Sequence, residues 1–167
     1  MTPADPVQSP QVGPVAELQR RQELWTRLIA DLDGAAARFT LHEAGPSIAW
    51  LLGHNLVNTD SVAEAVGGRS RSLEPTFSER HAEPHFGVTS DADWDALRKL
   101  WEPTALRTRD AVRAQTDLES APDVPIRPEF QGHLTTRRAF LDGHLFHLTW
   151  HAGQVGMLRA ALGLSWA

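Results

Sequence analysis

Apolar residues recur at helical spacing along most of the chain, whereas no stretch shows the strict alternation typical of a strand. The clearest example is a run of apolar positions separated by three, four or seven residues: Leu18, Trp25, Leu28, Leu32, Ala36 and Phe39. Such a stripe is typical of an amphipathic helix with one buried face. Comparable patterns predict four helices, over residues 15–38, 46–65, 91–115 and 134–162. Four helices without a strand predict an all-α four-helix bundle, a fold in which sites are formed by side chains from facing helices.

Residues that start or stop helices support these limits. Pro46 suits a first helical turn, where its missing N–H is not needed, and the glycine pair at residues 67–68 is a strong stop. Ser90 or Asp91 can cap the third helix. Pro103 is expected to bend that helix, because proline removes a backbone hydrogen bond.

The start of the chain differs from the helical part. Residues 1–14 are polar and contain several prolines, which predicts a flexible tail ahead of a single domain over residues 15–167. This start has neither the basic nor the apolar region of a secretory signal. No apolar run in the chain reaches about 18 residues, the length that a membrane span requires. We therefore expect a cytoplasmic protein without a membrane segment.

A long connection is expected over residues 67–90, because this segment shows little periodicity and contains Pro75 and Pro84. Structureless loops of this length are uncommon and often functional, so the segment could close over a site. It carries His81 and His85, but Pro84 opposes a helix that would bring the two rings together. We therefore interpret both as solvated loop histidines.

Charge and cysteine content narrow the range of functions. The formal net charge is -5, and the Lys and Arg residues form no block, which argues against nucleic-acid binding. The chain has no cysteine, so disulfides, thiolate metal sites and cysteine nucleophiles are excluded. A metal ion would have to be held by His, Asp or Glu side chains.

Three histidines lie close together in the last predicted helix. His147 and His151 are four residues apart, a spacing that puts two imidazoles on one helical face and supplies half of a tetrahedral metal site. His144 shares this face, so the pair of His144 and His147 competes on spacing alone. His54, one turn after Trp50 in the second predicted helix, is a candidate third ligand. Taken alone, such a histidine is more often a structural residue than a ligand.

Two segments resemble signature motifs of DinB/YfiT-like proteins. The sequence Pro-Ser-Ile-Ala-Trp-Leu-Leu-Gly-His, from Pro46 to His54, is similar to the second-helix motif of that family. The sequence His147-x-x-x-His151-Ala-Gly-Gln is similar to its last-helix motif, and the resemblance covers residues 15–164. The resemblance implies an up-and-down variant of the four-helix bundle. It also implies a divalent metal ion, often zinc or nickel, held by His54, His147 and His151.

The same resemblance suggests roles for neighbouring residues. It leaves His144 outside the ligand set, where it would face the substrate or support a ligand from behind. Trp50 and Gln154 would line the site or orient a ligand. Gly153 would allow close packing of helices.

Three histidine ligands leave an open coordination position, which is the mark of a catalytic rather than a structural site. The members of this family with known activity use the corresponding site for reactions of low-molecular-weight thiols. They include thiol S-transferases and a thiol-dependent maleylpyruvate isomerase. The resemblance therefore implies a metal-dependent thiol S-transferase that takes a thiol as cosubstrate and a small molecule as acceptor. One alternative is a metal-dependent hydrolase, with Glu43 or Asp60 as an unsupported candidate base. Another is a non-catalytic metal-binding stress-response protein.

The tryptophan content bears on assembly. The chain has six tryptophans, more than a small core obviously needs. Bundles of the family that it resembles often pair through their helices. We therefore expect a homodimer.

Overall fold

The computed structural model describes residues 13–68, 70–125 and 132–166. The described residues form helices and connections, with no strand among them, which confirms the predicted all-α fold. The tail predicted over residues 1–14 lies outside the described part of the chain except for its last two residues. None of the described helices combines the length and the apolar character needed to cross a membrane.

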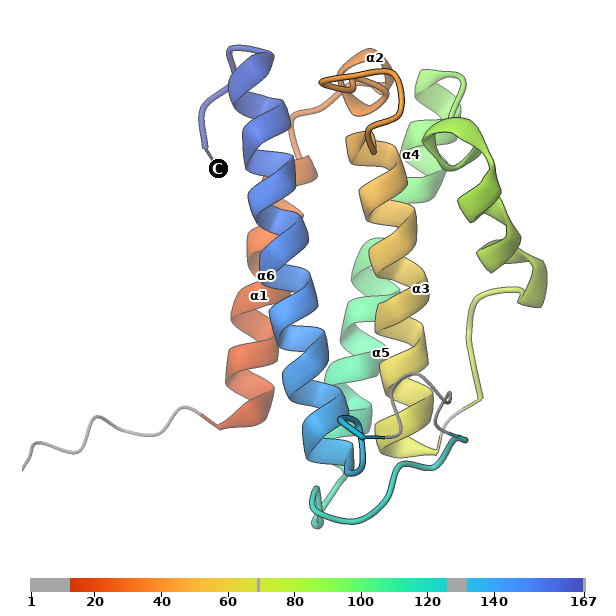
Figure 1. Ribbon diagram of the computed structural model, residues 1–167, viewed down its shortest axis with the longest axis vertical. Helices are drawn as coiled ribbons and strands as arrows, with labels where there is room; N and C mark the ends of the chain where they lie inside the picture. The colour runs from red at the N-terminus through yellow and green to blue at the C-terminus, as the bar shows by residue number, and fades with distance from the viewer. Residues whose placement is uncertain (1–12, 69, 126–131, 167) are drawn as a thin grey trace, which may run out of the picture.

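Four helices form the bundle in Figure 1: α1 (Pro14–Ile29), α3 (Ile48–Gly67), α5 (Trp101–Arg113) and α6 (Arg137–Ala161). Helices α1 and α6 run in one direction, and α3 and α5 run in the other. Because α3 and α5 are parallel, the chain must return along the bundle between them. The segment after α3 makes this return, which explains why the connection is long.

The first predicted helix is interrupted. Helix α1 ends at Ile29, and a short α2 (Gly34–Ala37) follows, so the prediction of one helix over residues 15–38 is wrong. Asp33 causes the restart, because its carboxylate accepts a hydrogen bond from the backbone N–H of Ala36 and caps α2.

The third predicted helix is also divided, into α4 (Asp91–Lys99) and α5. Ser90 caps α4 as predicted and forms a capping box with Asp93. The helix breaks at Leu100 instead of bending at Pro103. Pro103 still accounts for the break, because it lacks the N–H that would bond to the carbonyl four residues earlier.

The other two helices begin later than predicted. Each starts after a hydroxyl cap, Ser47 for α3 and Thr136 for α6, whose side chain accepts a hydrogen bond from the backbone N–H three residues later. Pro46 therefore precedes α3 instead of occupying its first turn. Helix α3 ends near the predicted stop, where Gly68 adopts a left-handed conformation with a φ of 59°.

The connection expected to be structureless contains two 3-10 turns, η1 (Pro75–Ala82) and η2 (Pro84–Gly87), together called the strap below. The strap packs against α3, and Phe86 on it is fully buried. A Cβ atom on Gly53 would lie 2.3 Å from the ring of Phe86, so only glycine permits this approach. The strap is therefore seated directly on the helical turn that bears the histidine of α3.

Half of the tryptophans belong to the core. Trp25, Trp94 and Trp101 are buried, and each indole N–H donates a hydrogen bond to an oxygen of a neighbouring element. Buried indole nitrogens need such partners, so these bonds tie the helices together in one arrangement. By contrast, Trp150 and Trp166 are exposed.

Candidate metal centre

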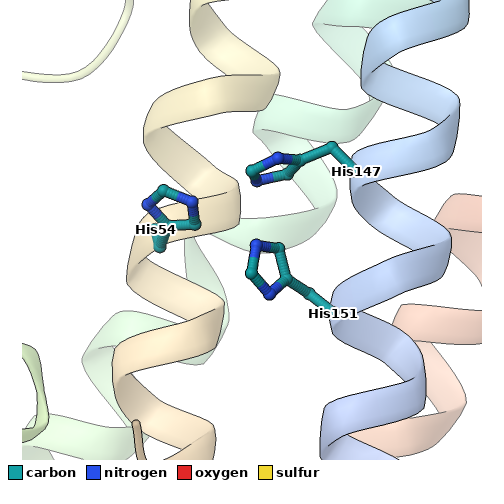
Figure 2. A group of neighbouring side chains, drawn as sticks. All are labelled: His54, His147 and His151. Atoms are coloured by element: carbon teal, nitrogen blue, oxygen red, sulfur yellow. The ribbon is translucent and has the colours of Figure 1, made fainter.

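Three histidine rings meet between α3 and α6. His54 projects from α3, and His147 and His151 project from successive turns of α6 (Figure 2). The ring centroids of His54 lie 4.8 Å from His147 and 5.1 Å from His151. The centroids of His147 and His151 are 4.4 Å apart. One nitrogen of each ring lies within 4.8 Å of the other two, so the structure brings the three predicted residues together.

The helices and one aromatic side chain set this geometry. Helix α6 is continuous through both of its histidines, so their four-residue spacing places them on one face. On α3, Trp50 lies one turn before His54 and stacks on its ring, with centroids 5.0 Å apart and planes inclined by 14°. The stack holds the imidazole of His54 in the orientation that faces α6.

Burial keeps the three rings neutral. Desolvation, together with repulsion from the neighbouring imidazoles, lowers the pKa of His54 to about 3. The same causes lower the pKa of His147 to about 4. Desolvation also lowers the pKa of His151, although its hydrogen bond to Gln154 opposes the shift. A neutral imidazole offers a lone pair to a metal ion, so all three rings are in the form that ligation needs.

The free ring nitrogens fit a metal ion. Nε2 of His147 is buried and has no hydrogen-bond partner within the described part of the chain. Nδ1 of His54 lies 2.9 Å from His81, and Nδ1 of His151 lies 2.5 Å from Gln154. The Nε2 atoms are therefore the candidates for binding a common ion, although Nε2 of His54 has the side-chain nitrogen of Asn58 3.3 Å away. Figure 2 shows a nitrogen of each ring turned toward the space between them. Imidazole donors without a carboxylate suit zinc, nickel and related transition metals better than magnesium or calcium.

Comparison with known proteins assigns the chain to a family. Residues 14–163 match the family described as mycothiol-S-transferase. The chain belongs to the mycothiol S-transferase family. That family is part of the DinB/YfiT-like superfamily, so the predicted resemblance of the chain to these proteins is confirmed.

A solved structure shares the fold of this mycothiol S-transferase family member. It is the crystal structure of the conserved protein of locus from Enterococcus faecalis, with a TM-score of 0.68 and 16% sequence identity. The match covers 90% of this chain and 95% of the other. At this level of sequence identity it supports the fold alone. No curated protein matches the chain.

The structure also shows the surroundings of His144 and Gly153, two residues for which roles at or near the site were predicted. His144 is only 4% exposed, and its Nε2 lies 3.5 Å from the hydroxyl of Thr59. Its buried ring therefore does not face a substrate, whereas the alternative role of supporting a ligand stays a prediction. Gly153 is exposed and has no atom within 4 Å of the position of a Cβ, so the prediction that it allows close helix packing is wrong.

The two candidate bases are placed differently from each other, and neither gains support. The buried carboxylate of Asp60 accepts hydrogen bonds from the backbone N–H groups of Ser72 and Leu73, and it pairs with Arg107 at 2.8 Å. These bonds anchor the chain as it leaves α3. Glu43 is exposed in the connection before α3.

Two neighbours of His54 are not among the residues predicted for the site. The interpretation of His81 as a solvated loop histidine is wrong, because its half-buried ring lies against His54 and its Nδ1 donates to the carbonyl of Ser78 at 2.7 Å. Local sequence could not reveal this contact, which depends on the path of the strap over α3. Asn58 donates a hydrogen bond to the carbonyl of His54 at 2.8 Å and lies 3.3 Å from its Nε2. Asn58 could have been predicted as a neighbour of His54, because residues four apart lie on the same face of a helix.

Proposed function

We propose that His54, His147 and His151 bind one divalent transition-metal ion, zinc or nickel, and that the protein transfers a low-molecular-weight thiol to a small electrophile. The observation that supports metal binding is the convergence of three neutral imidazoles, one of which has a buried nitrogen without a partner among the described residues. Membership in the mycothiol S-transferase family supports the thiol as cosubstrate.

The side chains divide the work of such a reaction. His54, His147 and His151 would hold the ion, which would lower the pKa of a thiol bound to it. The chain has no cysteine, so the sulfur nucleophile comes from the cosubstrate. Its thiol releases a proton to solvent, and the sulfur forms a bond to the electrophilic carbon of the acceptor while the leaving group departs with the electron pair of its own bond. The three histidines hold their positions throughout, and Trp50 shields one face of His54 from water.

The hydrogen bonds that already engage Asp60 favour thiol transfer over hydrolysis with this carboxylate as the base. A hydrolase activates water with the help of a positioned base. Asp60 is engaged by the backbone of Ser72 and Leu73 and by Arg107, and its bonds already serve the fold. A thiol ionises far more readily than water, so thiol transfer needs less help from a base.

A panel of thiols tests the proposal. The protein is purified without a histidine tag, loaded with zinc or nickel, and assayed with mycothiol, glutathione and coenzyme A against a generic electrophile. Ester and amide substrates are assayed in parallel without thiol. Turnover that needs both metal and thiol, and is lost in His151→Ala but kept in His133→Ala, is the expected result. Hydrolysis without thiol would support a hydrolase instead, and metal uptake without turnover would support a non-catalytic metal-binding protein.

We also propose that a second copy of the chain packs on the outer face of α6. Three large apolar side chains are exposed along this face: Phe146, Trp150 and Met157, at 68%, 60% and 58%. The exposed positions from Gly143 to Ala160 carry no charged residue. Apolar patches of this kind mark interaction surfaces, and an uncharged face is suited to pairing with its own copy.

A further inference from the structure

We propose that His81, on the strap, is a positioning residue that fixes the tautomer of His54, so that His54 donates through Nδ1 and keeps the lone pair of Nε2 for a metal ion. This inference rests on the proposed function only in taking a metal ion as the ligand of His54. The hydrogen-bond arrangement itself belongs to the protein without metal.

One end of the arrangement is a backbone carbonyl. Nδ1 of His81 lies 2.7 Å from the carbonyl oxygen of Ser78, which can only accept a hydrogen bond. Nδ1 of His81 therefore carries a proton, and in a neutral ring its Nε2 has a lone pair. That Nε2 lies 2.9 Å from Nδ1 of His54, so it accepts a hydrogen bond from the N–H group at Nδ1 of His54.

The contact between Asn58 and Nε2 of His54 indicates the same tautomer. The side-chain nitrogen of Asn58 donates to the backbone carbonyl of His54 at 2.8 Å, which identifies it as the nitrogen and not the oxygen of the amide. This N–H group lies 3.3 Å from Nε2 of His54. A donor can sit beside this ring nitrogen only if the nitrogen has a lone pair. The contact is long, so a metal ion displaces it at little cost.

The strap is attached to α3 in a way that holds His81 in place. The indole N–H of Trp50 donates to the backbone carbonyl of His81 at 3.1 Å. Phe86 fills the space above Gly53 and contacts the ring of His81 edge-on, with centroids 5.2 Å apart. The acceptor for His54 therefore sits on a segment that is fixed on both sides of the ring.

Such outer partners are energetically important for histidine ligands. They select the tautomer, orient the ring and raise its basicity, and their loss typically lowers metal affinity about 10- to 100-fold. The substitution His81→Phe removes the acceptor and keeps an aromatic ring against Trp50 and Phe86. His81→Gln is the rescue variant, because the end of its side chain can place an oxygen near the position of Nε2. His85→Asn is the matched control on the strap, since asparagine tolerates the left-handed φ of 52° found there.

Two measurements test the inference on folded protein, with helix content checked by circular dichroism. Nitrogen-15 NMR of the imidazole rings in metal-free protein reports which nitrogen of His54 carries the proton. Competition with a chromophoric chelator reports zinc affinity. We expect the Nδ1–H tautomer in wild type, a shift toward Nε2–H together with about a 10- to 100-fold loss of affinity in His81→Phe, and recovery of both in His81→Gln. His85→Asn should match wild type.

Several outcomes would overturn the inference. They are an Nε2–H tautomer in wild type, an unchanged tautomer in His81→Phe even if affinity falls, or a zinc-bound structure in which His81 is itself a ligand. If wild type takes up no zinc, the proposed function fails, whereas the NMR comparison still decides whether His81 sets the tautomer of His54.

Discussion

The side-chain oxygen of Gln154 lies 2.5 Å from Nδ1 of His151, within one turn of α6. A glutamine oxygen only accepts hydrogen bonds, so His151 donates from Nδ1 and its Nε2 is left with a lone pair. Two rings of the centre are thus oriented by acceptors of different origin. His151 is held by a residue of its own helix, and His54 is held by a residue of the strap.

Substitution of Gln154 should weaken metal binding without disturbing the fold. We expect Gln154→Leu to lower zinc affinity about 10-fold or more, because His151 loses the acceptor that fixes its ring. Gln154→Glu keeps an acceptor oxygen and should bind zinc at least as tightly as wild type. Chelator competition measures both. Equal affinities for Gln154→Leu and wild type would show that the bond does not orient a ligand.

Removal of the metal should abolish activity but leave the bundle folded. The core of α1, α3, α5 and α6 is built from buried apolar side chains that do not depend on the site. We expect His151→Ala and chelated wild type to keep their helical circular dichroism while thiol transfer is lost. The thermal midpoint should fall by about 5–10 °C, because an ion present at 100 times its Kd stabilises the native state by about 2.7 kcal/mol. Unfolding on chelation would identify the site as structural.

Two glycines next to ligand histidines should respond oppositely to the same substitution. Gly53→Ala places a methyl group 2.3 Å from the ring of Phe86, so the strap must shift, at a cost of about 1–3 kcal/mol. Gly153→Ala meets no atom within 4 Å and should stabilise α6 by about 0.5–1 kcal/mol, since alanine is the better helix former. Urea unfolding measures both. Similar effects of the two changes would contradict the close seating of Phe86 on α3.

The metal-free protein should lose stability in mild acid. Burial lowers the pKa of His144 from 6.5 to about 4, so between these values the unfolded chain binds a proton that the folded chain does not. The free energy of unfolding should therefore fall as the pH drops from about 6.5 to about 4, and the contribution of this ring should be complete above pH 6.5. His144→Leu should make this dependence shallower, with the remainder due to His54 and His147. Urea unfolding over a pH series, with His133→Leu as the exposed control, measures the difference, and parallel curves for wild type and His144→Leu would refute it.

A charge on the outer face of α6 should separate paired chains. We expect wild type to be a dimer by light scattering and Met157→Arg to be a monomer, because the introduced charges would be buried opposite each other. Leu106→Arg is the control, as Leu106 is an apolar residue of α5 that is 47% exposed. A wild-type monomer at micromolar concentration, or a Met157→Arg dimer, would rule out this interface.

The features that could be predicted from sequence are those set by the geometry of a single helix. The pairing of His147 and His151 follows from 3.6 residues per turn, and Ser90 as a cap follows from the hydrogen-bonding needs of a helix start. Periodicity alone did not assign His54 to the same site, and that assignment came from the resemblance of two separated motifs. The contact of His81 depends on a return of the chain along α3, and the energies that set this path lie in the burial of Phe86 and the bond from Trp50. Neither is visible in the spacing of residues 67–90.

The ligand histidines lie on two helices that are far apart in the sequence, with His54 on α3 and His147 and His151 on α6. An ion shared between them would close a large loop of the chain, and so would reduce the conformational freedom of the unfolded ensemble if it stayed bound there. In a chain without cysteine, it would take the place of a disulfide as a link between α3 and α6. Unlike a disulfide, this link would be indifferent to reductants and would be opened by chelators. The supply of metal would then set how firmly α3 and α6 are held together in the folded bundle, whatever the redox state of its surroundings.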